Sequence, residues 1–329
     1  MNILVCGGAG YIGSHTVLEL LDKGFNVVVV DNLKTGHKAS VSKNAKLYIG
    51  DLRDKDFLRE VFKENEIHGV IDFAAYSLVG ESAINPSKYF DNNIHGTQCL
   101  LDVMREFNVN YIVFSSTAAT YGEPDSIPIL ETDKTEPTNP YGESKLCVEK
   151  ILKWYDDAYG MKYVVLRYFN VAGAHISGEI GEAHTIETHL IPLVLQVPLG
   201  KRDAISIFGD DYDTHDGTCI RDYIHVTDLA NAHILAINKI FKDNTSETYN
   251  LGNGKGFTVK EIIETSEKVV GKDINKKIVP RRKGDPARLV ASSEKIMKEL
   301  DWKPEYNSLE KIIETAWSWH KNNPNGFEK

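Results

Sequence analysis

The segment that decides the fold is Asn2-Ile3-Leu4-Val5-Cys6-Gly7-Gly8-Ala9-Gly10-Tyr11-Ile12-Gly13. Its apolar start is typical of a buried parallel strand, and glycines follow at once. Gly7 permits a tight turn, Gly10 lets the backbone approach a pyrophosphate, and Gly13 allows close packing of helix on strand. In this strand-to-helix context the glycines predict a dinucleotide loop at a helix N-terminus. A glycine turn without a ligand is the alternative.

The next apolar run, residues 26–31, ends in an acid that argues for the ligand. Asp31 can accept hydrogen bonds from the ribose hydroxyls of a dinucleotide. It is followed by Asn32 and Leu33 rather than by an arginine, which favours NAD over NADP, although Lys34 leaves NADP open. The competing interpretation of Asp31 is a carboxylate that only caps a turn.

Up to about residue 170, β-branched runs alternate with segments of helical period. This pattern predicts an α/β protein with a Rossmann-type doubly wound parallel sheet. The expected strands are 2–6, 26–31, 46–50, 69–73, 111–115 and 163–167. The expected helices lie near 12–23, 54–65, 87–107 and 142–160. A long connection, 116–140, follows a strand end, and loops of that length are usually functional.

Beyond residue 170 the pattern loosens, which predicts a smaller C-terminal substrate-binding lobe over the mouth of the sheet. We expect helices at 186–199 and 227–241. The second of these, with a strand at 248–251, looks like one more unit that returns to the main sheet. The predicted division is therefore 1–170, with 227–251 joining it, and mainly 171–329 for the smaller lobe.

Composition narrows the class of protein. The 329 residues are long enough for one large or two unequal cores, and the net charge of −9 argues against a nucleic-acid partner. No signal peptide or membrane anchor is recognised, so we expect a cytoplasmic protein. The four cysteines are scattered, which predicts neither a disulfide framework nor a metal site. For His184, His215 and His225 we expect ordinary surface or loop roles.

A catalytic pair stands at Tyr141 and Lys145, four residues apart on one face of a predicted helix. An ammonium near the phenol, together with a cationic nicotinamide, is expected to lower the pKa of Tyr141 and make it a usable base. Thr117 ends a predicted strand and could donate to the same substrate oxygen. Strand-terminal hydroxyls can also bond only their own backbone, and that alternative stays open for Thr117 and more so for Ser116.

Together, the glycine loop, Asp31 and the Tyr141/Lys145 pair resemble the extended short-chain dehydrogenase/reductase family over essentially the whole chain. Further segments are similar to the motif series of its UDP-glucose (UDP-galactose) 4-epimerases. They are 7–13, 31–33, 79–82, 91–93, 141–145, 167–170, 209–212, 221–226 and 281–285. The resemblance implies redox-neutral epimerisation at C4 of a UDP-hexose through a 4-keto sugar, with NAD as cofactor.

The resemblance also implies site residues. The expected catalytic residues are Tyr141, Lys145 and Thr117. The expected cofactor residues are Gly7, Gly10, Tyr11, Ile12, Gly13, Asp31, Asn32, Leu33, Thr35, Gly36, Asp51, Leu52, Phe73, Ala74, Ala75, Ser77, Asn92, Ser115, Tyr141, Lys145 and Phe169. The expected substrate residues are Thr117, Tyr141, Asn170, His189, Leu190, Phe208, Arg221, Arg282, Asp285 and Leu289. Among these, Phe208 is expected on the uracil, Arg221 and Arg282 on phosphate oxygens, and Asp285 on the ribose.

Three positions depart from the better-known family pattern. Ser77 occupies the position of a lysine that often contacts the cofactor, Thr117 replaces a serine, and His189 replaces an asparagine. The first puts NAD retention in doubt, and the last could make binding pH-sensitive. A nucleotide-sugar 4,6-dehydratase is a rival, but the acid it needs after the threonine is Ala118 here. A decarboxylating or net reductase and a non-catalytic NAD(H) sensor are the other rivals.

Two expectations concern assembly and specificity. The helices near 87–107 and 142–160 resemble the pair through which the family builds a four-helix homodimer contact. Their apolar residues are expected to exceed what one sheet-facing stripe requires: Leu100, Leu101, Val103, Met104, Val148, Ile151, Leu152 and Tyr155. Leu289 aligns with a position where some epimerases carry tyrosine, so it predicts space for an N-acetyl group unless it packs in the core.

Overall fold

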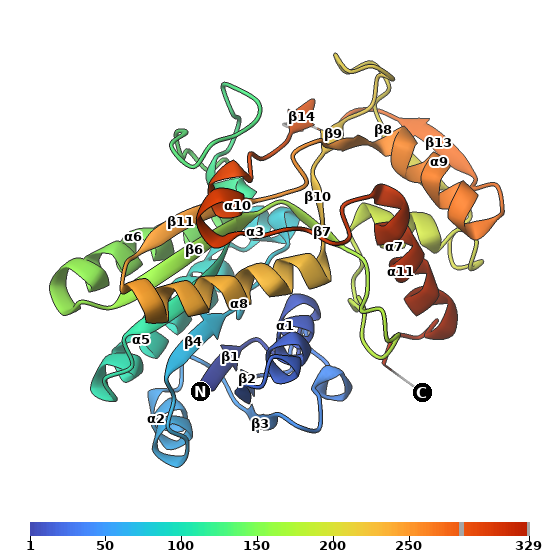
Figure 1. Cartoon of the computed structure of the whole chain (residues 1–329). Coiled ribbons are helices and arrows are strands. Elements are labelled where there is room, and N and C mark those ends of the chain that lie inside the picture. Colours follow the sequence, from blue (N-terminus) through green and yellow to red (C-terminus); the bar gives the residue numbers. More distant parts are fainter. Residues whose placement is uncertain (283–285, 328–329) are drawn as a thin grey trace.

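A seven-stranded parallel sheet forms the centre of the computed structural model, which describes residues 1–282 and 286–327 (Figure 1). Its order is β11-β6-β5-β4-β1-β2-β3. The strands are β1 (Asn2–Cys6), β2 (Asn26–Asp31), β3 (Lys46–Ile49), β4 (Gly69–Asp72), β5 (Tyr111–Thr117), β6 (Lys162–Tyr168) and β11 (Glu247–Leu251). The order reverses beside β1, where a Rossmann-type sheet opens a crevice for ligands. The predicted fold class is confirmed.

Helices cover both faces of the sheet. On one face α1 (Tyr11–Asp22) and α8 (Val226–Asp243) share a core with the strands, and α10 (Glu294–Leu300) joins them. The other face is packed by α2 (Lys55–Glu64), α5 (Gly96–Glu106) and α6 (Pro140–Tyr159). Both faces of each inner strand are therefore buried, which explains their continuous apolar runs.

The predicted helix at 87–107 is broken in the structure. It consists of α4 (Pro86–Tyr89), a π-helical segment η2 (Phe90–His95) and α5, and a further helix, α3 (Val79–Ile84), precedes it. Within η2 the buried Asn93 donates to the Tyr76 carbonyl and to the Ser144 hydroxyl, both at 3.0 Å, and it accepts from the Tyr76 amide. A single wider turn of this kind often lies at a functional site.

Leu100, Leu101, Val103 and Met104 of α5 are fully buried within the chain, as are Val148 and Leu152 of α6. Two neighbouring helices and the sheet share them, so the expected surplus of exposed apolar residues is wrong for these positions. The exposed apolar side chains of this face are different ones: Trp154 and Tyr159 of α6 and Phe90 of η2.

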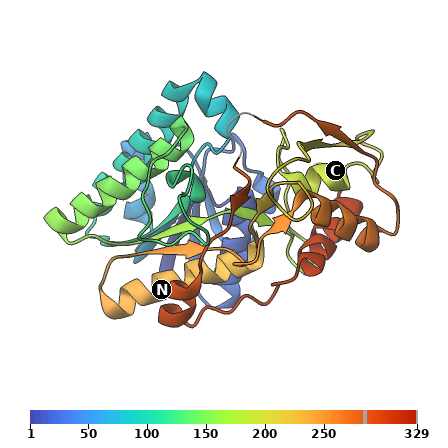
Figure 2. The same cartoon turned by 90° about the horizontal axis from the view of Figure 1, so that it is seen from above.

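A smaller lobe with its own core lies beside one end of the sheet, clearest when the molecule is seen from above (Figure 2). Its helices are α7 (Leu190–Leu195), α9 (Val259–Val270) and α11 (Leu309–Asn322). Its short strands are β7 (Asn170–Ala172), β8 (Ile205–Phe208), β9 (Ile220–Arg221), β10 (Tyr223–His225), β12 (Phe257–Thr258), β13 (Lys276–Val279) and β14 (Arg288–Leu289). Two one-turn 3-10 helices, η1 (Lys38–Ser40) and η3 (Ala118–Thr120), belong to the part of the chain before residue 170.

In the described residues, no helix is long and apolar enough to cross a membrane.

The helix predicted at 186–199 is present but shorter, because α7 covers only Leu190–Leu195. The Glu187 carboxylate accepts hydrogen bonds from the backbone N–H groups of Thr188 and His189, both at 2.7 Å, and holds them in a loop. Pro192 then fits in the first turn of α7, where its missing N–H does no harm. The strand at 248–251 is real, and β11 pairs in parallel with β6 at the edge of the main sheet.

Candidate active site

One large cavity, of about 1270 Å³, runs from the glycine loop across the carboxyl ends of the strands into the smaller lobe. Gly7, Asp31 and Tyr141 line its sheet side, and Phe208 and Arg282 line the far end. Pockets for drug-sized ligands usually span about 300–1,000 Å³, so there is room for more than one such ligand. The position matches the ligand crevice of an open α/β sheet.

Two glycines of the loop, Gly7 and Gly13, leave no room for a side chain. Gly7 has φ +72°, and a Cβ there would lie 2.8 Å from the backbone nitrogen of Ala74. A Cβ on Gly13 would lie 2.2 Å from the Gly7 carbonyl oxygen, so helix α1 can pack here only without a side chain. Gly10 precedes α1 in an extended conformation and lines the cavity. The turn at Gly7 and the close packing at Gly13 are as the sequence predicts, and the approach of Gly10 to a pyrophosphate stays a prediction.

Asp31 ends β2 and is fixed by two backbone donors. Its carboxylate accepts from the amides of Ala9 and Leu33 at 2.9 and 2.8 Å. Burial raises the pKa of Asp31, and the two N–H groups oppose that shift. The Asp31 carboxylate therefore stabilises the glycine loop through hydrogen bonds and also lines the cavity.

Two of the expected cofactor residues lie outside the cavity wall. Leu33 adopts a positive φ of 56°, and its amide holds Asp31. Gly36 packs behind the glycine loop, where a Cβ would come within 2.8 Å of the Ala9 carbonyl carbon. Both residues support the loop rather than face the ligand crevice. The other expected cofactor residues all line the cavity.

Tyr141 and Lys145 lie in the first two turns of α6, which Asn139 caps by accepting from the Gly142 amide at 2.9 Å and which has Pro140 as its first residue. The Lys145 side chain is buried, and its ammonium donates to the Ser115 carbonyl at 2.7 Å. Burial lowers the pKa of Lys145 to about 8, although Asp72 and Glu149 act in the opposite direction. The predicted pair shares one wall of the cavity with Thr117.

The protein residues alone shift the pKa of Tyr141 upwards, and the expected lowering by Lys145 with a cationic nicotinamide stays a prediction. Burial raises the pKa of this phenol, and the group that lowers it is the hydroxyl of Thr117, through a hydrogen bond. The Lys145 ammonium is instead engaged with the Ser115 carbonyl. Thr117 thus contacts the phenol, and it also accepts from the Ala119 amide at 3.2 Å.

The two serines before Thr117 point to different faces of the sheet, as successive strand residues must. Ser115 lines the cavity and bonds the Tyr168 hydroxyl. Ser116 donates to Glu149 at 2.5 Å on the other side. For Ser116 the structure therefore favours a structural role, though with a side chain rather than with its own backbone.

The expected substrate residues gather at the smaller lobe. Asn170, His189, Leu190, Phe208, Arg221 and Arg282 all line the cavity. The guanidinium carbon of Arg282 lies 3.9 Å from the centre of the Phe208 ring, a close cation–π contact. Asp285 lies outside the described residues. Leu289 is not among the cavity residues; it sits in β14, in register with Arg221 of β9.

The comparisons with known proteins agree with this geometry. The family model described as "NAD dependent epimerase/dehydratase family" matches residues 3–252. This chain belongs to that family. A UDP-glucose 4-epimerase of Halalkalibacterium halodurans is 58% identical over 327 residues, which are 99% of this chain and 98% of the relative.

Solved structures of the family superpose closely. A crystal structure of a UDP-glucose 4-epimerase has a TM-score of 0.98 at 57% identity and covers 100% of both chains. The Bifidobacterium longum UDP-glucose 4-epimerase, solved with NAD+ and UDP, has a TM-score of 0.94 at 44% identity and covers 99% of this chain and 100% of its own. The chain is an enzyme of the epimerase branch, and NAD is its cofactor.

The residues of this family member fit NAD. The glycine cradle leaves no space for a Cβ at Gly7 or Gly13, and Asp31 is held at the end of β2. Asn32 follows and donates to Asp51 at 3.0 Å, so no cation faces the ribose edge from this position. A 2′-phosphate would need such a cation. Lys34 does line the cavity, so the assignment of NAD rests on the relatives and solved structures rather than on this position alone.

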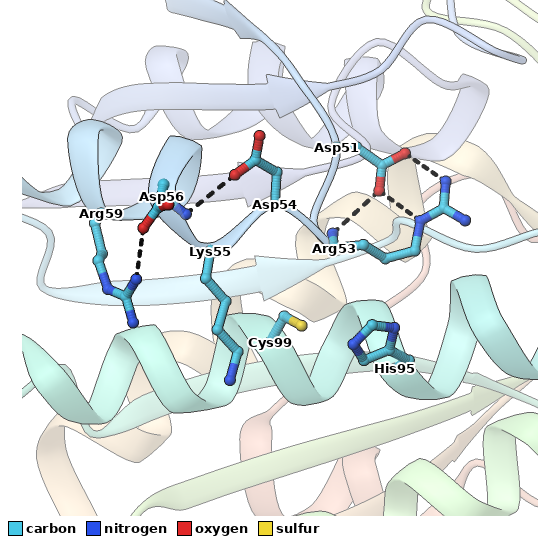
Figure 3. Close-up of a pocket in the computed structure, with 8 residues that line it drawn as sticks. All are labelled: Asp51, Arg53, Asp54, Lys55, Asp56, Arg59, His95 and Cys99. Atoms are coloured by element: carbon cyan, nitrogen blue, oxygen red, sulfur yellow. Dashed lines mark hydrogen bonds and ion pairs between the residues drawn. The ribbon is translucent and has the colours of Figure 1, made fainter.

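A second hollow, of about 620 Å³, lies beside the cavity near α2 and α5 (Figure 3). Its charged side chains neutralise each other. Arg53 pairs with Asp51 at 2.8 Å and with Asp91 at 2.5 Å, and Lys55 pairs with Asp102 at 2.7 Å. Arg53 is also the main reason why the pKa of Asp51 is held far below its usual range. The hollow thus shapes the outer edge of the cofactor end, at Asp51, and is not a separate site.

Some buried residues of the site escaped the sequence analysis. Asp72 ends β4 and accepts from the Ala74 amide at 3.0 Å, and burial raises its pKa while Lys145 opposes the shift. Glu149 and Arg167 form a buried ion pair behind Ser116. An acid at the end of a buried strand, and an acid on α6 four residues after Lys145, were the available signals.

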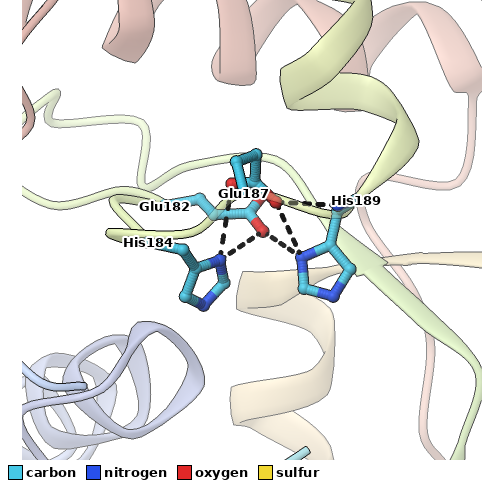
Figure 4. Close-up of side chains that lie close together, drawn as sticks. All are labelled: Glu182, His184, Glu187 and His189. Atoms are coloured by element: carbon cyan, nitrogen blue, oxygen red, sulfur yellow. Dashed lines mark hydrogen bonds and ion pairs between the residues drawn. The ribbon is translucent and has the colours of Figure 1, made fainter. Parts of the chain in front are cut away.

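The histidines were only partly predicted. His225 is buried, caps α8 by accepting from the Thr227 amide, and contacts Thr315 at 2.9 Å, so it is neither a surface nor a loop residue. His215 is exposed and lies 3.3 Å from Glu261. His184 and His189 converge on Glu182 and Glu187, a cluster that the sequence analysis did not expect (Figure 4).

Proposed function

We propose that this chain catalyses the NAD-dependent, redox-neutral epimerisation of UDP-hexoses at C4, with UDP-glucose and UDP-galactose as the central pair. The observation that carries the proposal is the position of Thr117, Tyr141 and Lys145. They line the middle of one cavity, between the glycine loop and the Phe208/Arg282 end. A reactive sugar carbon and a nicotinamide would have to meet at that point.

Thr117 and Tyr141 are proposed to share the substrate's 4-hydroxyl oxygen. Tyr141 accepts the proton of this hydroxyl as the C4–H bond breaks, and a 4-keto sugar results. NAD, when bound, supplies the hydride acceptor and then the hydride donor. After the ketone turns its other face, Tyr141 returns the proton to the oxygen. No electrons or atoms are gained or lost overall.

The electrostatics of the site bear on how Tyr141 becomes a base. Burial alone raises its pKa, so the phenolate must be stabilised by neighbouring groups. The Thr117 hydroxyl is one such group, and the Lys145 ammonium, fixed on the Ser115 carbonyl, adds positive charge to the same wall. The proposed role of Lys145 is therefore to favour the charged form of Tyr141 once the ligands have excluded water.

The nucleotide is proposed to anchor the substrate while the sugar turns. Asn170 and Leu190 would hold the diphosphate side, with His189 near the phosphates and Arg221 and Arg282 supplying cations. Phe208 offers an aromatic face to the uracil, a sequence-tolerant form of base recognition. Asp285, expected on the ribose, lies outside the described residues. The domain division follows: 1–170 with 227–251 for NAD, and mainly 171–329 for the UDP-sugar.

The rival reactions predict different products. A 4,6-dehydratase needs an acid directly after the threonine, where η3 begins with Ala118-Ala119. A net reductase would accumulate NADH, and a non-catalytic NAD sensor would turn nothing over. We would incubate the purified protein with UDP-glucose, separate the products by chromatography and follow NADH by absorbance. UDP-galactose without free NADH supports the proposal, whereas a 4-keto-6-deoxy product, free NADH or no turnover would reject it.

Assembly as a homodimer and a cytoplasmic location remain part of the proposal. Trp154 is 68% exposed and Tyr159 is 50% exposed, both on α6, which is more apolar surface than a solvent-facing helix needs. Phe90 of η2 is also exposed. Light scattering at micromolar concentration tests the dimer, and a monomeric mass would contradict it.

A further inference from the structure

Four ligand-type side chains converge in the loop before α7 (Figure 4). They are Glu182, His184, Glu187 and His189, and one ligand atom from each lies within 4.8 Å of the others. Both histidines turn the same ring nitrogen, Nδ1, towards the two carboxylates. Three of its members line the cavity wall, and His189 is the one to which the function proposed above gives a part, near the substrate phosphates.

Three nitrogen–oxygen separations in the cluster are close to the edge length of a zinc tetrahedron, although Glu187 turns Oε2 towards His184 and Oε1 towards His189. Ligand atoms bound at about 2.0–2.2 Å from a zinc ion lie about 3.3–3.6 Å from one another. His184 Nδ1 lies 3.1 Å from Glu182 and 3.4 Å from Glu187, and His189 Nδ1 lies 3.4 Å from Glu187. The fourth pair, His189 with Glu182, is a direct hydrogen bond of 2.5 Å.

Hydrogen bonds alone serve this arrangement poorly. Each imidazole Nδ1 carries at most one hydrogen, yet each faces two carboxylates. Charge-assisted hydrogen bonds normally measure about 2.7–2.9 Å, so the contact of 3.4 Å between His184 Nδ1 and Glu187 Oε2 is longer than a good hydrogen bond. Two acids this close, with Glu182 almost fully buried, need a compensating charge. Two protonated imidazoles can supply that charge, and one dication between the four atoms would supply it to both acids at once.

The surroundings already hold the acids in place. The Glu182 carbonyl accepts from the Trp319 indole at 2.9 Å, which ties this residue to α11. Glu187 accepts from the amides of Thr188 and His189 through Oε1, and its Oε2 faces His184. Outer contacts of this kind orient ligands in metal sites.

We propose that Glu182, His184, Glu187 and His189 bind one divalent transition-metal ion of the zinc type, in a tetrahedral two-histidine, two-carboxylate site. Four protein ligands leave no open position, which is typical of a structural rather than a catalytic zinc. The sequence analysis expected no metal, because the ligands are histidines and glutamates in a loop and not paired cysteines. The site lies outside the Tyr141 machinery.

The ion would stiffen the wall of the substrate cavity. It would join both ends of loop 182–189, directly before α7 begins at Leu190. Without it, His184, Glu187 and His189 would have more freedom where they line the cavity. Metal removal is therefore expected to raise KM for the UDP-sugar several-fold with little change in kcat. This consequence rests on the function proposed above, whereas metal binding itself does not.

The test is metal content and zinc titration of the full-length protein. Protein treated with a chelator and desalted should bind about one zinc ion per chain in a calorimetric titration. After reloading with zinc and desalting, elemental analysis should find about one retained ion per chain. His184→Gln and His189→Gln should each abolish stoichiometric binding. His215→Gln is the matched control, because His215 is exposed and pairs with Glu261 elsewhere; it should bind zinc as the wild type does.

A second measurement guards against misfolding. Glu187→Gln keeps the size of the side chain and removes one charge, and it should weaken zinc binding at least tenfold while NAD content and the thermal midpoint of the apo protein stay unchanged. A cobalt-loaded wild type should show the visible absorption of a tetrahedral site. The proposal is overturned if the wild type binds no zinc, or if the histidine variants bind it equally well, whatever the epimerase activity.

Discussion

The ammonium nitrogen of Lys145 donates a 2.7 Å hydrogen bond to the backbone carbonyl of Ser115 at the carboxyl end of the sheet. Helix α6 and strand β5 are thereby joined at the point where the reaction is proposed to occur. The charged lysine sits in a buried place, next to an equally buried Asp72. Burial lowers the pKa of Lys145 into the range in which enzymes are assayed, and a first prediction follows from this.

Activity is expected to fall as the pH rises through about 8, the value to which burial lowers the pKa of Lys145. Above it the amine is neutral and no longer favours the phenolate of Tyr141. Because folding lowers this pKa from 10.5, the charged lysine destabilises the fold below pH 8, and the penalty fades as the pH rises towards 10.5. Profiles of kcat against pH, for wild type and Lys145→Arg, provide the check.

Arginine keeps its charge throughout this range. The variant should turn over more slowly, but its alkaline limb should move upwards. An alkaline limb at the same pH in both proteins would show that another group titrates.

Tyr141→Phe is expected to lower turnover at least ~100-fold, because the general base is removed. The ring still fills its place, so NAD content should not change. Tyr159→Phe is the matched control, since Tyr159 lies on the same helix and is half exposed. Steady-state assays with UDP-galactose measure both. A near-normal rate for Tyr141→Phe would remove this residue from the proposed mechanism.

Specificity is expected to include UDP-N-acetylglucosamine beside UDP-glucose. Leu289 is in register with Arg221, a cavity residue, but does not itself line the cavity, so a larger side chain could reach in. Leu289→Tyr should therefore lose the N-acetylated activity selectively. Chromatography of both equilibrated nucleotide sugars gives the ratio. Equal loss on both substrates would mean that Leu289 only packs, as the alternative interpretation has it.

Arg167→Met should destabilise the protein by about 3–5 kcal/mol, because it leaves Glu149 buried without its partner. The side chains of Arg167 and Glu149 are 9% and 8% exposed, so water cannot solvate the Glu149 carboxylate in place of the missing guanidinium. Urea denaturation at neutral pH measures the loss. The double variant with Glu149→Leu should recover part of it, and no recovery would argue against the ion pair as the cause.

Much of the sheet could be predicted because each inner strand is a short apolar run that ends at a polar residue. The runs ending at Cys6 and Asp31 match β1 and β2, and the glycines between them have a purely local cause. The same locality made the Tyr141/Lys145 pair visible, since both residues lie on one helix face.

Features that depend on contacts between distant parts of the chain could not be predicted from the sequence. The π-helical turn at Asn93 depends on Tyr76 and Ser144, which come from elsewhere in the chain. The late start of α7 depends on a carboxylate that captures its own backbone. The cluster of Glu182, His184, Glu187 and His189 could not be predicted, because it depends on a loop conformation that hydrophobic periodicity does not indicate. Burial, which the sequence does not report, raises the pKa of Tyr141 in the chain without its cofactor.

The pairing of β11 with β6 has a consequence for how the protein can be cut or synthesised. A fragment that stops near residue 170 would contain the whole glycine loop and the catalytic pair. It would nevertheless expose the edge of β6 and the apolar face that α8 covers, and such an edge invites aggregation. During translation, the sheet of the cofactor half can therefore be complete only once β11 (Glu247–Leu251) has been made. Dissecting the two lobes at a single cleavage point would yield no stable half.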